Sequence, residues 1–236
     1  MLPEEDIQRW MPELTRVELW HGMVLNEAGA AFTHCYFPTT AIVSLHHLLR
    51  SGACAETALV GREGLVGISL FMGDGSTSNR AVVQTAGHAW RLPARTLVKE
   101  FSRASGAMRI ALRYTQALLT QMAQTAVCNR HHSLEQQLCK WFLFRLDRLS
   151  GNNLFTTHEL IASMLGVRRE GVTDAALKLQ RRGIIRYTRG HITVLDRQAL
   201  EAGACECYCV VKKEYDRLLP TLAHAPAGFT ALVARR

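Results

Sequence analysis

The chain contains 236 residues, 48% of them hydrophobic and 20% charged, and its 28 basic side chains outnumber 20 acidic ones to give a net charge of +8. This length is enough for two modest domains with separate cores, and the positive charge favours a nucleic acid over an acidic metabolite as the main partner. The sequence has no run of eighteen apolar residues and starts with acidic residues (MLPEED), which predicts a cytoplasmic protein without a membrane partner. Its seven cysteines lack the spacing of a disulfide framework, so we expect their thiols to stay reduced.

The first hundred residues contain short apolar or alternating runs separated by glycines. Such runs, with turn residues at near-regular intervals, are typical of an antiparallel double-sheet roll or barrel. We therefore predict a jelly-roll-like β-roll over residues 1–100 and consider it the candidate sensor domain. The predicted strands cover residues 17–25, 33–37, 41–49, 55–60, 81–86 and 88–92.

Residues 61–80 (GREGLVGISLFMGDGSTSNR) are the most site-like part of this roll. Their glycines can present backbone N–H groups to a phosphate, and Arg80 can supply the opposite charge. Glycines of this kind also occur in ordinary turns that bind nothing. Gly67 and Arg80 are therefore the candidate effector-binding residues, and the identity of any effector or cofactor stays open.

A long periodic segment follows the roll at residues 101–128. Apolar or small side chains recur in it every three or four residues, as at Met108, Thr115 and Met122, and no proline interrupts it. The predicted helix is longer than an average globular helix. Its stripe can pack against its own roll or pair with the same helix of a second subunit. We expect a hinge at residues 129–132, a further amphipathic helix over 133–149 and a loop at 150–153.

Residues 156–182 fit two short helices joined by a tight turn. Thr156 and Glu159 have the spacing of a capping box, in which two backbone N–H groups find reciprocal partners. Ala162 is small enough for a second helix to cross closely, and Gly166 supplies the positive φ that the turn requires. The second helix should turn an apolar side toward the core, formed by Val167, Val172, Ala176 and Leu179.

The opposite side of this second helix carries groups that suit the edges of DNA bases. Arginine can donate two hydrogen bonds to guanine, glutamate can accept one from the cytosine amino group, and lysine or threonine can reach phosphates or thymine methyl groups. The predicted DNA-binding residues, including one from the following hairpin, are Thr156, Arg168, Arg169, Glu170, Thr173, Asp174, Lys178 and Arg189.

Residues 184–187 and 191–195 alternate like strands around the turn Thr188-Arg189-Gly190, which predicts a hairpin wing after the two helices. Between Gly166 and His191 seven arginine and lysine side chains oppose two acids, a concentration that suits a polyanion. Winged helices also dock proteins, but the capping box, turn glycine, exposed face and wing together favour DNA. Because such proteins generally read two half-sites about one DNA turn apart, we predict a homodimer through residues 101–129 on a palindromic operator.

The C-terminal part contains a further amphipathic segment, in which Asp196 can cap a helix and apolar residues from Leu200 to Leu218 form one continuous stripe. Cys205, Cys207 and Cys209 lie in this segment. On one helix Cys207 points nearly opposite to the other two, so the three thiols cannot enclose a single tetrahedral ion, and we expect no metal site. The DNA-binding domain should cover residues 130–220. Residues 221–236 carry no clear pattern, which is compatible with a disordered tail.

Together with the glycine-punctuated N-terminal half, the segment LGVRREGVTDAALKLQRRGIIRYTRGHITV resembles the DNA-binding end of a Crp/Fnr-family bacterial transcription regulator. The resemblance covers roughly residues 10–219 and implies a cyclic-nucleotide-binding-like β-roll. It also implies that Arg169 and Glu170 read base edges. A basic residue often follows one turn later in that family, whereas this chain has Asp174, a difference that leaves its operator sequence open.

The resemblance bears on the effector as well. Cyclic-nucleotide-binding relatives hold the ribose with a Gly-Glu step and the phosphate with an Arg-Ser step, and the corresponding places here read Gly67-Ile68 and Asn79-Arg80-Ala81. The ribose carboxylate is missing and the arginine is displaced by one residue, which reverses its face on a strand. The iron–sulfur pattern of another branch is absent, since no cysteine precedes Cys35. Haem stays an open alternative through the histidines of the sensor half, which are His21, His34, His46, His47 and His88.

No nucleophile elbow, P-loop, His-Glu-x-x-His helix or dinucleotide glycine motif occurs in a fitting context, so we expect no enzyme and no catalytic residues. The sequence predicts an α+β protein with an N-terminal β-roll, a long dimerisation helix and a C-terminal winged helix-turn-helix. Its predicted function is that of a dimeric, sequence-specific transcription regulator, which would contact RNA polymerase if it activates. The alternative is a small-molecule, haem or metal sensor whose winged helix docks a protein.

Overall fold

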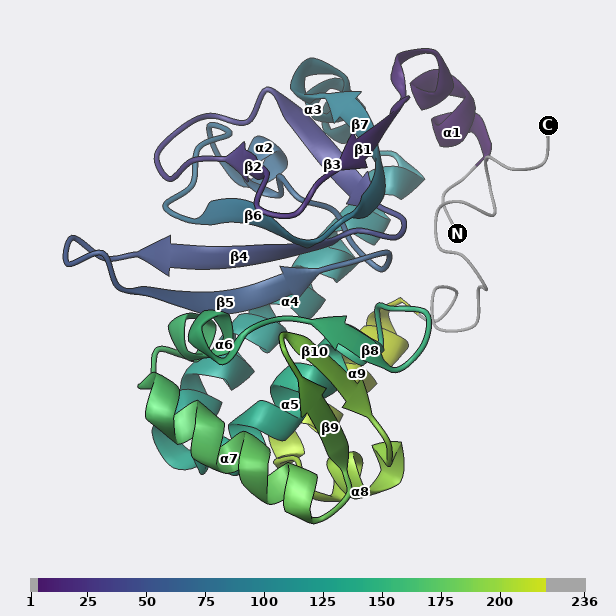
Figure 1. The fold of residues 1–236 in the computed structure, drawn as a ribbon. Helices are drawn as coiled ribbons and strands as arrows, with labels where there is room; N and C mark the ends of the chain where they lie inside the picture. The colour runs from purple at the N-terminus through teal and green to yellow at the C-terminus, as the bar shows by residue number, and fades with distance from the viewer. Residues whose placement is uncertain (1–3, 220–236) are drawn as a thin grey trace. The chain divides into compact units, whose positions relative to one another are not determined.

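Short strands are concentrated in the first half of the chain, and helices predominate in the second half (Figure 1). The computed structural model describes residues 4–219, so the predicted tail at 221–236 lies outside the described residues. The predicted α+β class, with its β-roll, long helix and winged helix-turn-helix, is confirmed. The elements are, in chain order, α1 (Glu4–Trp10), η1 (Met11–Glu13), β1 (Thr15–Leu19), β2 (Val24–Asn26), β3 (His34–Pro38), β4 (Ile42–Leu48), β5 (Cys54–Val60), α2 (Ser69–Met72), β6 (Arg80–Thr85), β7 (Gly87–Pro93), α3 (Ala94–Ser102), α4 (Gly106–His131), α5 (Leu134–Leu146), β8 (Asn153–Phe155), α6 (His158–Leu165), α7 (Arg169–Arg181), β9 (Ile185–Thr188), β10 (His191–Val194), α8 (Arg197–Ala202) and α9 (Glu206–Leu218).

The chain divides into two compact units. Among the described residues the first unit, which we call the roll unit, comprises residues 4–45, 58–120 and 213–219. The second comprises His46–Thr57 and Gln121–Lys212, and we call it the reader unit because it contains the segment predicted to read DNA. The tip of the β4–β5 hairpin therefore groups with the reader unit although the bases of both strands belong to the roll. Helix α4 likewise contributes its first part to one unit and its last part to the other.

The roll is built from two antiparallel sheets, one in the order β1-β7-β3 and one in the order β2-β6-β4-β5 (Figure 1). In the first sheet Leu19 lies opposite Gly87 and Cys35 lies opposite Leu92. Leu19, Cys35 and Leu92 have no exposed surface, which shows that alternate side chains fill the interior of the roll. Burial also raises the pKa of the Cys35 thiol.

Most predicted strands are present with small shifts in their ends, but the first prediction is wrong. Residues 17–25 do not form one strand, because β1 ends at Leu19 and β2 begins at Val24. Gly22 has a φ of 82° in the turn between them, a conformation that suits glycine. The apolar pattern continued across this turn and therefore concealed it.

Helix α4 starts and ends later than predicted. Residues 101–102 belong to α3, and Ala104, with a φ of 51°, lies in the break before α4 begins. The predicted hinge at 129–132 is wrong in its first three positions, since α4 continues to His131 and the chain leaves the helix only at His132. The predicted stripe divides between two sides of the helix. Ala111 and Leu118 are buried, whereas Leu112 and Leu119 are 44% and 47% exposed.

Helix α5 forms the centre of the reader unit, and Leu138, Phe142 and Leu143 on it are completely buried. Its start is fixed by a capping box in which Ser133 accepts from the Gln136 backbone and the Gln136 side chain accepts from the Ser133 N–H. The loop predicted at 150–153 ends one residue early, because β8 begins at Asn153 and joins a sheet in the order β8-β10-β9.

The C-terminal amphipathic segment is not the continuous helix that we predicted. Asp196 caps α8 by accepting from the Ala199 N–H, as expected, but α8 ends at Ala202 and α9 begins only at Glu206. Cys205 therefore lies between two helices. All seven cysteines are free thiols. In the part of the chain that the structure describes, no helix is long and apolar enough to cross a membrane.

Candidate nucleic-acid interface

Helix α6 starts one residue later than the capping prediction required. Thr157 is the N-cap, and its hydroxyl accepts from the Leu160 N–H at 3.1 Å, so the box predicted from Thr156 and Glu159 is wrong. Thr156 is only 8% exposed, and its backbone N–H donates to the Gly190 carbonyl at 2.9 Å. The backbone hydrogen bond of Thr156 therefore connects the helix pair to the wing. Because its side chain is buried, Thr156 does not form part of the outer surface.

The turn between α6 and α7 has the predicted form. Gly166 ends α6 in the left-handed region with a φ of 67°, and the Val167 N–H returns to the Ala162 carbonyl at 3.0 Å. Any side chain at Gly166 would be strained in this conformation. Ala162 is 4% exposed, so it lies buried next to this turn.

Helix α7 packs its predicted apolar side inward. Val172, Ala176 and Leu179 are buried, the first and last completely, whereas Val167 precedes the helix and is only half-buried. A Cβ atom placed on Gly171 would lie 2.9 Å from Cδ2 of Leu134, so α7 also approaches α5 closely at its first turn. These contacts fix which side of α7 faces outward.

The outward side of α7 carries most of the predicted DNA-binding residues. Arg169 and Glu159 of α6 form a long ion pair of 3.9 Å, in which their side chains stay 66% and 74% exposed. Exposed pairs of this kind stabilise a protein by roughly 0–1 kcal/mol, so Arg169 can exchange Glu159 for another partner at little cost. The other exposed members of this set are Arg168, Glu170, Asp174 and Lys178.

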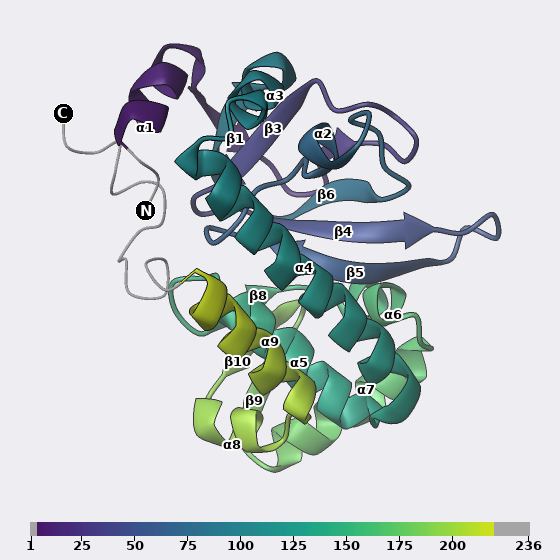
Figure 2. The same ribbon diagram turned by 180° about the vertical axis from the view of Figure 1, so that it is seen from behind.

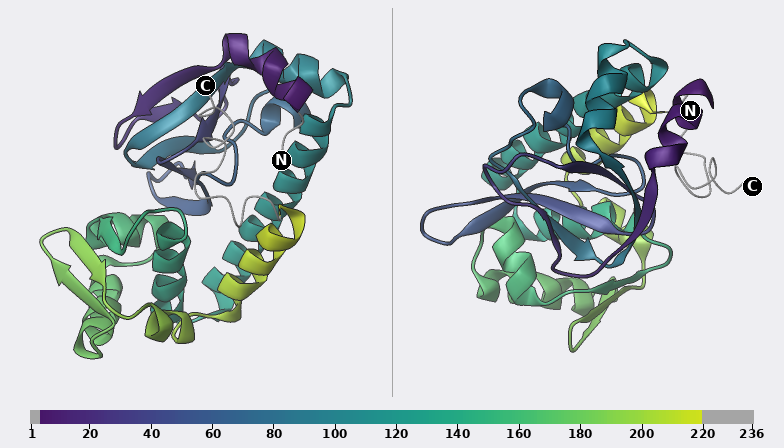
Figure 3. Two further views of the ribbon diagram at one scale, coloured as in Figure 1. Left: turned by 90° about the vertical axis from the view of Figure 1, so that its right-hand side faces the viewer. Right: turned by 90° about the horizontal axis from the view of Figure 1, so that it is seen from above.

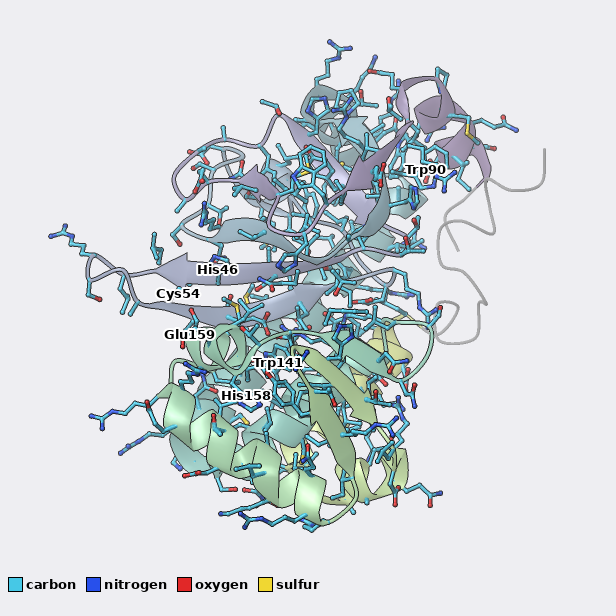
Figure 4. All side chains as sticks on the ribbon, in the orientation of Figure 1. His46, Cys54, Trp90, Trp141, His158 and Glu159 are labelled. Atoms are coloured by element: carbon cyan, nitrogen blue, oxygen red, sulfur yellow. The ribbon has the colours of Figure 1, made fainter. Side chains whose placement is uncertain are left out.

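Thr173 has a different role, because its hydroxyl is occupied within the protein. It donates to the Arg169 carbonyl at 3.1 Å and lies 3.0 Å from Nδ1 of His158. His158, at the start of α6 (Figure 4), stacks on Tyr187 of β9 with ring centroids 4.2 Å apart. Burial, and then the charge of Arg169, lowers the pKa of His158. A neutral imidazole thus connects α6, α7 and the wing, a role that the sequence did not reveal.

The wing is a tight hairpin with a basic tip. His191 pairs with Thr188, which leaves Arg189 and Gly190 as a two-residue loop. Their φ angles are 44° and 85°, and positive values at both central positions are typical of the type I′ turn that suits hairpins. Arg189 is exposed at this tip, and Figure 3 shows the hairpin at the edge of the reader unit.

The tip of the β4–β5 hairpin contacts two helices of the reader unit. Glu56 forms an ion pair of 2.7 Å with Arg145 of α5, and the side chains are only 10% and 5% exposed. The Arg145 guanidinium lies 3.3 Å from the ring centroid of Trp141. Cys54 lies 3.0 Å from the Ser163 hydroxyl of α6 (Figure 4). Nothing in the sequence pattern indicated this contact, because the residues lie about a hundred positions apart.

Both candidate effector-binding residues of the roll make contacts within the protein: Gly67 is closely packed, and Arg80 is ion-paired. Gly67 has a φ of 112°, and a Cβ atom there would lie 3.4 Å from the Cys35 backbone. Arg80 makes two contacts of 2.8 and 2.9 Å with the Glu27 carboxylate. The sensor-half histidines considered for haem join no group of three or more potential metal ligands among residues 4–219.

Comparison with known proteins supports the resemblance seen in the sequence. Residues 136–202 match the Crp-like helix-turn-helix domain. Similar solved structures include a putative Crp/Fnr-family transcriptional regulator from Eubacterium rectale, with 20% identity and a TM-score of 0.65 over 85% of this chain and 94% of that one. A CRP/FNR-family regulator from Thermus thermophilus has 22% identity and a TM-score of 0.62 over 80% and 98% of the two chains. FixK2 from Bradyrhizobium japonicum has 17% identity and a TM-score of 0.67 over 81% and 98%. No curated protein matches the sequence.

Proposed function

We propose that this chain, which carries a Crp-like helix-turn-helix domain within the fold of the Crp/Fnr transcription regulators, is a dimeric, sequence-specific DNA-binding regulator of the bacterial cytoplasm. The observation that carries the proposal is the outward side of α7, where Arg169 and Glu170 begin the helix and lie exposed. Buried contacts on the other side hold this surface rigid, as a surface that discriminates between bases requires.

We assign base readout to Arg169 and Glu170, and backbone contacts to the basic residues around them. An arginine at the first turn of a recognition helix can donate two hydrogen bonds to guanine, and the adjacent carboxylate can accept from cytosine. Arg189 at the wing tip suits a phosphate. Thr156 is left out of the interface because it is buried, and Thr173 because its hydroxyl holds His158.

We assign dimerisation to α4. Leu112 and Leu119 are exposed and lie seven residues apart, the spacing at which side chains share one side of a helix. Exposed Ala126 continues the same spacing. Two copies of this helix packed side by side would bury these apolar groups and place two readers on a palindromic site.

The experiment that tests this proposal is the selection of bound DNA from a random pool at fixed salt, with the parent and two variants. The parent should select inverted half-sites. Arg169→Ala should lose about 1–3 kcal/mol of discrimination at one base pair of each half-site. Arg189→Ala should weaken binding to all sequences about equally and make it less dependent on salt.

Arg16→Ala provides the control, because Arg16 is an exposed arginine on β1 of the roll. Its selected sites and affinity should equal those of the parent. If Arg169→Ala keeps the parent's site preference, the assignment of the reading surface is wrong. Selection of single half-sites would contradict the dimer, and binding that is insensitive to salt and to Arg169 would instead favour a protein partner for the winged helix.

A further inference from the structure

Three thiols and an imidazole meet inside the reader unit, at the point where α4 ends and α9 begins. Their potential ligand atoms all lie within 4.8 Å of one another. Cys128 and His132 come from the last turn of α4 and the residue after it, whereas Cys205 and Cys207 come from the break before α9 and from its first turn. The three cysteines are at most 3% exposed and form a buried cluster of their own.

Two separations within this group are close to those expected of ligands around one tetrahedral ion. Zinc–sulfur bonds of about 2.3 Å and a zinc–nitrogen bond of about 2.0 Å place two sulfurs about 3.8 Å apart and a sulfur and a nitrogen about 3.5 Å apart. The Sγ atoms of Cys128 and Cys205 are 3.5 Å apart, and Sγ of Cys207 lies 3.6 Å from Nδ1 of His132. We propose that Cys128, His132, Cys205 and Cys207 bind one structural zinc ion.

The surroundings of the four residues suit this ion. Glu206 accepts a hydrogen bond from Nε2 of His132 at 3.2 Å, which directs Nδ1 toward the thiols, as carboxylates commonly do for zinc-bound histidines. Three thiolates and a neutral histidine around Zn²⁺ carry one net negative charge. Lys140 is buried, and its positive charge interacts electrostatically with the thiols of Cys128 and Cys207, so it can balance that negative charge.

Other uses of these cysteines fit less well. A disulfide between Cys128 and Cys205 would shorten their separation to about 2.05 Å and leave Cys207 and His132 without a role. A cluster of several irons needs ligands spread around more than one metal ion, whereas these atoms surround the volume of a single ion. Cys209 is exposed and takes no part in the group.

The proposed ion would hold together two segments that the chain separates by about 75 residues. Helix α9 starts beside the end of α4 (Figure 2), and α5 begins directly after His132. With four protein ligands the site has no open position, as is usual for structural zinc. Its role is therefore to fix the end of α4 against the start of α9 in the reader unit. This role does not depend on the DNA sequence that the reader unit binds.

The test is elemental analysis of the full-length protein, purified with a reductant and dialysed against metal-free buffer. The parent and Cys209→Ser should contain about one zinc per chain, and Cys128→Ser and Cys207→Ser less than a tenth of that. Since these two variants can also fail to fold, Co²⁺ is added to metal-free parent protein. It should give the intense visible bands of a tetrahedral thiolate site, which zinc then removes.

Two further variants separate coordination from mere structural damage. His132→Cys should retain zinc with a fourth thiolate, and Glu206→Gln should weaken zinc affinity about 10–100-fold in competition with a chelator. The proposal is overturned if the parent binds no zinc and shows no such cobalt bands, if it contains iron instead, or if Cys128 and Cys205 form a disulfide in the reduced preparation. Zinc retained at parent levels by both serine variants would show an adventitious ion only. None of these measurements uses DNA, so they stand apart from the test of the reading surface.

Discussion

Two regions have the sequence pattern of a binding site, but their polar groups behave differently. One is the glycine-rich loop of the roll, residues 61–80. The other is the proposed reading surface, formed by the exposed residues Arg168, Arg169, Glu170, Asp174 and Lys178 of the α7 region and by Arg189 at the wing tip. On the reading surface Arg168, Lys178 and Arg189 form no ion pair with any residue between 4 and 219, and Arg169 forms only the long, exposed pair of 3.9 Å with Glu159. In the loop, Arg80 is held by Glu27, and Asp74 accepts from both the backbone and the hydroxyl of Ser76.

This difference separates groups available to a ligand from groups that fold their own loop. A cation without a protein partner, on a helix whose other side is buried, loses little when a phosphate or a base approaches. An anionic effector at Arg80 would first have to replace Glu27. The geometry therefore supports a DNA-reading role for α7 more strongly than an effector role for Gly67 and Arg80.

The largest effect should come from the hairpin tip that packs on the reader. Glu56→Ala leaves the buried Arg145 guanidinium without its carboxylate, and removing one partner of a buried pair costs about 3–5 kcal/mol. Burial already lowers the pKa of Arg145, and Glu56 is the group that opposes this shift. Urea unfolding at neutral pH should show the loss of free energy directly.

A matched control is Glu18→Ala, which removes an exposed carboxylate from β1 and should change the free energy of unfolding by less than about 0.5 kcal/mol. The double variant Glu56→Leu with Arg145→Met should recover most of the loss, because it leaves no unpaired charge. Equal stability of Glu56→Ala and the parent would mean that the hairpin tip does not contribute to the stability of the reader.

Sequence patterns predicted the local features of both regions better than contacts between distant segments. Gly166 and the buried positions of α7 were evident because one turn and one helical period determine them. The cap was placed at Thr156 instead of Thr157 because two adjacent threonines offer the same chemistry. The contact of Glu56 with Arg145 lies beyond any pattern, since it depends on how the hairpin tip packs against α5.

The cysteine cluster illustrates the same limit. On a single helix, the spacing of Cys205, Cys207 and Cys209 predicts no metal site. The structure places Cys205 outside any helix and brings Cys128 and His132 to it from α4. A one-dimensional pattern contains neither the helix break nor the pairing of these two segments.

An intermediate effect should come from the loop of the roll, at Gly64. A Cβ atom there would overlap the ring of Tyr114, which is buried on α4, so Gly64→Ala must displace that ring or the loop. Overpacking of this kind costs about 1–3 kcal/mol. The expected result is a lower midpoint of thermal unfolding, measured by circular dichroism.

Gly73→Ala in the same loop is the matched control, since the nearest atom to its Cβ is the Ser69 carbonyl oxygen at 4.0 Å and its φ of −163° lies outside the left-handed region. It should unfold like the parent. If the two variants behave alike, the loop is not packed against α4, and movements of the loop would have no direct path to this helix.

The smallest effect should come from His158, whose imidazole is hydrogen-bonded to Thr173 of α7. The Thr173 hydroxyl donates to the Arg169 carbonyl, so Nδ1 of His158 donates to Thr173 and Nε2 would take the extra proton. Nε2 is buried without a hydrogen-bond partner among the described residues, which is consistent with the lowered pKa. The unfolded chain therefore binds a proton more readily than the folded one. The free energy of unfolding should fall as pH decreases from about 6.5 toward the lowered pKa.

Urea unfolding of the parent, of His158→Gln and of His47→Gln at pH 7.5 and 5.5 tests this expectation. His158→Gln should lose part of the parent's pH dependence, whereas His47→Gln, which removes an exposed histidine of β4, should keep it. Identical pH profiles for all three proteins would show that the imidazole does not couple α6, α7 and the wing.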